Sequence, residues 1–145
     1  MQNTDNTVDN HIKLFDYMDF EGFNKRNWQI VRDVYDENIV LKFSNGNEIR
    51  GIDNILKQMQ TGLEPETKTI SHPIHFGSGD WTAVVMVMTG RFTEPYTNPD
   101  GSITQPTGKL WIMEHCALVH WKNNKIIEVV AFWDNDVFLK QVGVC

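Results

Sequence analysis

The chain of 145 residues contains only two cysteines, Cys116 and Cys145, which are too few for a disulfide framework. No apolar run approaches the roughly 20 residues that a membrane-spanning helix needs. The first ten residues are polar and acidic, which is not the pattern of a secretory signal peptide. These absences argue against membrane binding and secretion, and they favour a cytoplasmic protein.

Positive charge is also scarce. The chain has 13 Lys and Arg against 19 Asp and Glu, a formal net charge of −6, and the basic residues are scattered. Such a surface repels a phosphate backbone, so we expect no nucleic-acid partner. The five histidines are too dispersed for the usual zinc-binding spacings, so the sequence predicts no metal site.

Hydrophobic residues make up 41% of the chain, enough for the core of a single domain over residues 1–145. Apolar spacing predicts an amphipathic helix over 7–25, a second helix after Asn27 and a third from Asp53 to about Met59. An early hairpin is predicted around Asn45-Gly46. Long strands are predicted over 68–76, 81–92, 110–121 and 125–134, followed by a short helix over about 135–142. This order predicts an α+β fold.

Residues 93–108 lie between two of these strands and are rich in proline and glycine. A connection of this length inside a compact domain is usually a lid, a binding loop or a disordered excursion.

The last two strands can be paired from the sequence. If Asn123 and Asn124 form a two-residue turn, Trp121 pairs with Ile126 and His115 with Phe132. One face then carries Met113, His115, Ala117, Val119, Trp121, Ile126, Glu128, Val130, Phe132 and Asp134. A three-residue turn would instead place Glu114, Cys116 and His120 on the face of Asp134. The Asn-Asn pair favours the first register.

The opposite face of the same hairpin is also apolar. A patch of this kind usually meets a partner. We therefore expect a homodimer through the outer face of the sheet, with an interface built on Leu118, Val129, Ala131 and Trp133.

Several segments together resemble the SnoaL-like polyketide cyclase, or ester cyclase, family. "NKIIEVVAFWDNDVFLKQVG" (124–143) is similar to the family's C-terminal signature, "PTGK" (106–109) to its Pro-Thr-Gly turn, and "FNKRNW" (23–28) to the link between its first helices. "GSGDWTAVVMVMTGRF" (77–92) resembles its Gly-Asp strand. Two features depart from the pattern: Asn124 replaces the usual glycine, and the loop over 93–106 is longer.

The resemblance implies the nuclear transport factor 2-like fold, a cone-shaped, strongly curved antiparallel or mixed sheet packed on three N-terminal helices with a short C-terminal helix. It also implies a cyclase-type enzyme without metal or cofactor, in which a pocket aspartate acts as acid and base on a small apolar carbonyl compound. That aspartate falls on Asp134. The register argument adds His115 as its partner.

We therefore predict Asp134 and His115 as catalytic residues. The predicted substrate-binding residues are Phe132, Met113, Trp121, Met88, Phe92 and His72. The simpler alternative is that Asp134 only caps the last helix. Other functions also remain open: a hydrolase or dehydratase on the same fold, a non-catalytic protein that binds a hydrophobic ligand, or an interaction domain that uses its outer sheet face.

Overall fold

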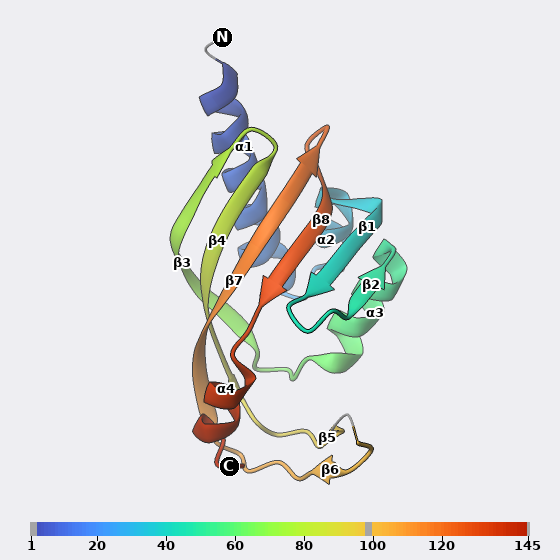
Figure 1. Ribbon diagram of the computed structural model, residues 1–145, viewed down its shortest axis with the longest axis vertical. Coiled ribbons are helices and arrows are strands. Elements are labelled where there is room, and N and C mark those ends of the chain that lie inside the picture. The colour runs from blue at the N-terminus through green and yellow to red at the C-terminus, as the bar shows by residue number, and fades with distance from the viewer. Residues whose placement is uncertain (1–2, 98–99, 145) are drawn as a thin grey trace.

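The computed structural model describes residues 3–97 and 100–144, so positions 98 and 99 of the long loop and Cys145 lie outside it. Most of the helices lie in the first half of the chain, and strands dominate the second half (Figure 1). The helices are α1 (Asn3–Tyr17), the π-helix η1 (Met18–Phe23), α2 (Trp28–Val34), α3 (Ile52–Gly62) and α4 (Asn135–Gln141). None of the described helices is long and apolar enough to cross a membrane.

Six strands form one open, mixed sheet in the order β2-β1-β8-β7-β4-β3. All neighbouring strands are antiparallel except β1 and β8, which run parallel. The strands are β1 (Tyr35–Phe43), β2 (Glu48–Arg50), β3 (Lys68–Ser78), β4 (Trp81–Arg91), β7 (Leu110–Lys122) and β8 (Lys125–Phe132). Within the long loop, β5 (Tyr96–Thr97) pairs with β6 (Ile103–Thr104). The predicted α+β architecture is confirmed.

The main core lies between the inner face of the sheet and the helices that pack behind it (Figure 1). Trp121 is fully buried there, its indole N–H donates to Thr82 Oγ1 at 3.0 Å, and its ring stacks on His11 of α1. A second cluster, made of Phe92, Trp111, Met113 and Val142, joins the start of β7 to the C-terminal helix.

The turn between β7 and β8 has the predicted two residues. Asn123 and Asn124 both have positive φ angles, 52° and 60°, as a type I′ turn requires, and Trp121 pairs with Ile126. One step further the register shifts, because His120 pairs with Glu128 and leaves Ile127 without an opposite residue. This is a β-bulge, in which one strand carries an extra residue. The predicted pairing of His115 with Phe132 is therefore wrong.

The bulge reverses the faces of the rest of β8, because side chains alternate strictly along a strand. Val129 and Ala131 are each 6% exposed and pack inside, whereas Phe132 is 41% exposed on the outside. The prediction that Val129, Ala131 and Trp133 form the outer face is wrong for this reason. Trp133 follows β8 and packs on the second core cluster, against Trp111. On β7 the predicted faces are correct: Met113 is buried on the inner side, and Leu118 is exposed on the outer side.

A matched pair of substitutions tests these faces. Val129→Thr should lower the free energy of unfolding by about 1–3 kcal/mol, because it buries a hydroxyl in an apolar environment. Val130→Thr, on the outer face, should change it by less than about 0.5 kcal/mol. Urea unfolding of both variants measures the difference. A larger loss for Val130→Thr would support the regular register without a bulge.

Candidate functional site

A cavity of about 280 Å³ lies between the inner face of the sheet and the helices. Its wall is mostly apolar, with Phe15 and Met18 from α1 and η1, Met59 from α3, and Met86 and Met88 from β4. Few polar side chains reach it. They are Asp19, Tyr35, Gln58, Thr69 and His115.

Among the described residues, Asp19 is the one carboxylate in this wall, and it is only 6% exposed. Its Oδ2 lies 2.6 Å from His72 Nε2, and its Oδ1 accepts a hydrogen bond of 3.3 Å from Thr69 Oγ1. Both partners come from β3, so the strand fixes the carboxylate at the cavity wall. A buried carboxylate needs such partners, because burial of an unpaired charge is strongly unfavourable.

The π-helix η1 carries Asp19, and Asn24 fastens this helix to β3. The Asn24 side chain donates to Thr69 O at 2.6 Å and accepts from Thr69 N at 2.8 Å, so both backbone polar groups of Thr69 are hydrogen-bonded. Arg26, in a left-handed conformation with φ 56°, donates to the carbonyls of Phe23 and Thr67. Single π-turns inside helices are frequent at functional sites.

His72 connects the cavity to a second carboxylate. Its Nδ1 lies 2.7 Å from Asp16 Oδ1, so both ring nitrogens face carboxylate oxygens, and carboxylates can only accept. Burial by itself would lower the pKa of His72, but the hydrogen bonds to Asp19 and Asp16 outweigh this effect and raise the pKa. The imidazolium form donates to both carboxylates.

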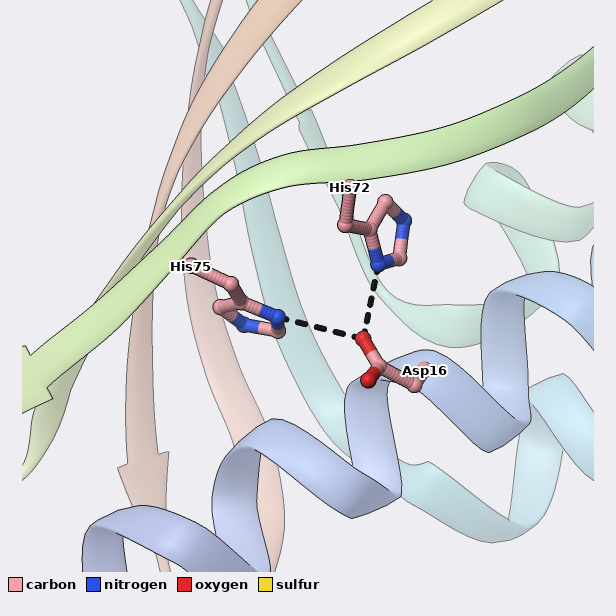
Figure 2. A group of neighbouring side chains, drawn as sticks. All are labelled: Asp16, His72 and His75. Atoms are coloured by element: carbon pink, nitrogen blue, oxygen red, sulfur yellow. Dashed lines mark hydrogen bonds and ion pairs between the residues drawn. The ribbon is translucent and has the colours of Figure 1, made fainter.

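His75 faces the same carboxylate. Figure 2 shows His72 and His75 projecting from β3 toward Asp16 on α1, and His75 Nδ1 lies 3.1 Å from Asp16 Oδ1. Residues three apart in a regular strand point to opposite faces. Here the register of β3 shifts twice, first between Thr69 and Ser71 and again between Ser71 and Ile74, and the second shift spans Pro73. This irregularity turns both histidines toward α1.

His115 and Tyr35 are the other groups with proton chemistry at the cavity. Within the described residues, the buried Nε2 of His115 has no hydrogen-bond partner, and desolvation lowers the pKa of this histidine. Burial, with a smaller contribution from the charge of Asp19, raises the pKa of Tyr35. At neutral pH the cavity therefore offers an uncharged imidazole and a protonated phenol beside a carboxylate.

The family model of the SnoaL-like polyketide cyclases matches residues 14–142. The chain belongs to this family. No curated protein sequence matches this SnoaL-like chain.

Solved structures share the fold of this SnoaL-like protein at low sequence identity. A candidate SnoaL-like polyketide cyclase from Jannaschia sp. CCS1 is 15% identical, with a TM-score of 0.82 over 95% of this chain and 94% of that one. IdmH, a candidate polyketide cyclase from Streptomyces antibioticus, is 19% identical, with a TM-score of 0.76 over 91% and 97%. An LEH-like epoxide hydrolase from M. tuberculosis is 8% identical, with a TM-score of 0.70 over 94% and 91%. The likeness shows the nuclear transport factor 2-like fold.

The predicted substrate-binding residues do not lie together. Met88 lines the cavity beside His115, and His72 lies behind its wall through Asp19. Met113, Phe92 and Trp121 are buried in the two core clusters and do not line the cavity. Phe132 points outward from β8.

Asp134 lies outside the cavity, contrary to the predicted placement. It is exposed and caps α4, where its Oδ1 accepts from the backbone N–H groups of Asp136 at 3.1 Å and Val137 at 3.2 Å. The bulge at Ile127 turned the even-numbered residues of β8 outward before the chain left the sheet. The structure thus shows the capping arrangement that was the alternative for this residue.

Sequence reasoning missed Asp16, Asp19 and Tyr35. A signal for Asp19 was present, because it sits among Phe15, Met18 and Phe23 on the apolar side of the first predicted helix. A carboxylate on a buried apolar face needs a hydrogen-bonding or charged partner. Asp19 could therefore have been identified as a candidate site residue.

The partly buried His115 should make stability depend on pH. Since burial lowers its pKa in the folded protein, the unfolded chain binds a proton first as the pH falls through about 6.5, and the folded state loses stability. Urea unfolding at pH 7.5 and pH 5 should show a smaller loss for His115→Gln than for the wild type. Both proteins retain the other histidines, so equal losses would contradict an uncharged His115.

Proposed function

We propose that this protein is a cyclase-type enzyme that needs no cofactor and acts on a small apolar carbonyl compound in the cavity. The observation that carries the proposal is Asp19, a carboxylate held at an apolar wall by the imidazole of His72. The family to which the chain belongs, named for polyketide cyclases, supports the reaction class. The acid and base role falls to Asp19, because Asp134 is exposed at the helix cap.

The proposed reaction is an intramolecular aldol closure. Asp19 removes a proton from the carbon next to one carbonyl, and the resulting enolate carbon forms a bond to a second carbonyl carbon of the same molecule. The protonated Asp19 gives this proton to the new alkoxide oxygen, so Asp19 ends the cycle ionised. Tyr35 and His115 line the same cavity and supply groups that can hydrogen-bond to the enolate and alkoxide oxygens.

The cavity favours a compact substrate. Its volume of about 280 Å³ lies near the lower end of the range for small-molecule sites, roughly 300–1,000 Å³. Its thioether and aromatic lining suits an apolar ring system, and its few polar groups would fix the orientation of the carbonyls.

Proton exchange tests this function without knowledge of the natural substrate. A panel of cyclic β-diketones and aryl ketones is incubated with the protein in D₂O, and loss of the α-proton signals is followed by NMR. We expect Asp19→Asn to slow the catalysed exchange by about 10²–10⁴-fold, because it removes the base. The matched variant Asp134→Asn should stay within about threefold of the wild type.

If Asp134→Asn slowed the exchange and Asp19→Asn did not, the catalytic role would belong to Asp134. A wild type that exchanges no ketone in the panel would favour the second candidate, a non-catalytic protein that binds a hydrophobic ligand. The apolar cavity and the outward position of Asp134 are the features that fit that candidate. Native mass spectrometry of protein purified from its own cells would then show the retained ligand.

We also propose that the protein forms a homodimer through the outer face of the sheet. This face exposes large apolar side chains, and none of the described helices packs against it (Figure 1). Monomers rarely leave a contiguous apolar patch of this kind in water. The exposed residues are Ile70, Ile74, Phe76, Trp81, Ile112, Leu118 and Phe132.

The charge variant Leu118→Glu/Phe132→Glu should be a monomer in analytical ultracentrifugation at concentrations where the wild type is a dimer. Each glutamate would have to be desolvated at the interface, at a cost of several kcal/mol. Ile103→Glu is the matched control, because Ile103 is equally apolar and 59% exposed but lies on the β5–β6 hairpin. A monomeric wild type would exclude the dimer.

A further inference from the structure

We propose that Asp16, His72 and His75 form a binding site for a divalent transition-metal ion, with Zn²⁺ as the reference ligand. One ligand atom from each of the three residues lies within 4.8 Å of the others, and the Nδ1 atoms of both histidines face Asp16 Oδ1 (Figure 2). Two imidazoles and one carboxylate are a ligand set that suits Zn²⁺, Ni²⁺, Co²⁺ and Fe²⁺. The inference rests on this geometry and does not require the proposed reaction.

The present distances are close to those of a metal site. Zn–N and Zn–O bonds of about 2.0–2.1 Å in a tetrahedron place neighbouring ligand atoms roughly 3.2–3.5 Å apart. Asp16 Oδ1 lies 3.1 Å from His75 Nδ1 and 2.7 Å from His72 Nδ1. A shift of about half an ångström by the carboxylate would open the required space. Asp16 can make this movement, because its side chain is 40% exposed.

The histidines are held in place by their surroundings. Their side chains are 4% and 6% exposed, and the irregularity around Pro73 directs both toward α1. Asp19 Oδ2 lies 2.6 Å from His72 Nε2, where it keeps a proton on that nitrogen and leaves Nδ1 as the ligand atom. Such an outer carboxylate on a ligating histidine is the usual partner in metal sites, and it raises the ligand's basicity.

Charge and access also fit a cation. Asp16 within the cluster and Asp19 next to it carry two negative charges, which would balance the charge of a divalent ion. The ion would take the place of the proton on His72 Nδ1. The partly exposed Asp16 gives the ion a route from solvent. Three protein ligands leave a fourth position for water, which is the composition of an open zinc site.

The sequence did not predict this site for a structural reason. His72 and His75 are three residues apart in a predicted strand, a spacing that normally places side chains on opposite faces. The third ligand comes from a helix more than fifty residues earlier. Only the register shift in β3 and the packing of α1 bring the three together.

Calorimetric titration of untagged, chelator-treated full-length protein with ZnCl₂ at pH 7.5 tests the proposal. We expect one Zn²⁺ per chain, binding at least tenfold weaker in both His75→Gln and Asp16→Asn, and 10–100-fold weaker in Asp19→Asn. His120→Gln is the matched control, because His120 lies on β7 beside Glu128 and away from the cluster. Its affinity should equal that of the wild type.

A Co²⁺-loaded sample adds a readout that does not depend on the variants. Tetrahedral or five-coordinate Co²⁺ bound by nitrogen and oxygen gives visible absorption without the near-ultraviolet band of a thiolate ligand. Absence of Zn²⁺ binding by the wild type at millimolar metal would overturn the proposal, and so would unchanged binding by Asp16→Asn. A thiolate band would also overturn it, because it would place the ion on a cysteine such as Cys116.

Discussion

The bulge at Ile127 is the constraint on which the rest of the site depends. A sheet with one face packed on helices tolerates no error in alternation, because a slip of one residue moves every following side chain to the other face. Here the extra residue sends Val129 and Ala131 inward against Ala117 and Val119, and sends Glu128 outward, where Lys42 neutralises it. The bulge thus keeps a charged side chain out of the core and small apolar ones in the cavity wall.

The second constraint is electrostatic. Asp19 is buried among Phe15, Met18 and Phe23, where an isolated carboxylate would be strongly destabilising. His72 resolves the conflict, since one imidazolium donates to Asp19 on one side and to Asp16 on the other. Asn24 and Arg26 complete the attachment of η1 to β3 and the segment before it. The carboxylate at the cavity wall and the docking of the first helix therefore depend on the same contacts.

Irregular backbone builds both halves of the candidate site. The π-turn of η1 carries Asp19. The irregularity around Pro73 turns His72 toward Asp19 and Asp16, and His75 toward Asp16. The solved structures with this fold carry names from cyclase to epoxide hydrolase, which agrees with the general rule that chemistry belongs to the site and not to the fold. In this protein the distinguishing groups are a carboxylate and an uncharged imidazole on an apolar cavity, backed by the Asp16–His72–His75 cluster.

The pattern of residues along the chain was enough to predict the helices, the strands and the family. Apolar periodicity predicted the helices and long strands, the Asn123-Asn124 pair predicted the two-residue turn, and the C-terminal signature predicted the fold. These features depend on the spacing of residues that are close together in the sequence, so they can be read from one sequence alone.

Which carboxylate lies at the cavity depends on long-range packing and could not be predicted from the sequence. Period-two reasoning placed Asp134 inside, because nothing in "KIIEVVAFWD" indicates that Ile127 is skipped by its partner strand. Asp19 reaches the cavity through contacts with β3 residues about fifty positions away, and His72 and His75 share a face only because β3 loses its regular register. Bulges and long-range pairings follow from the packing of the whole sheet against the helices, and the local pattern of residues does not encode them.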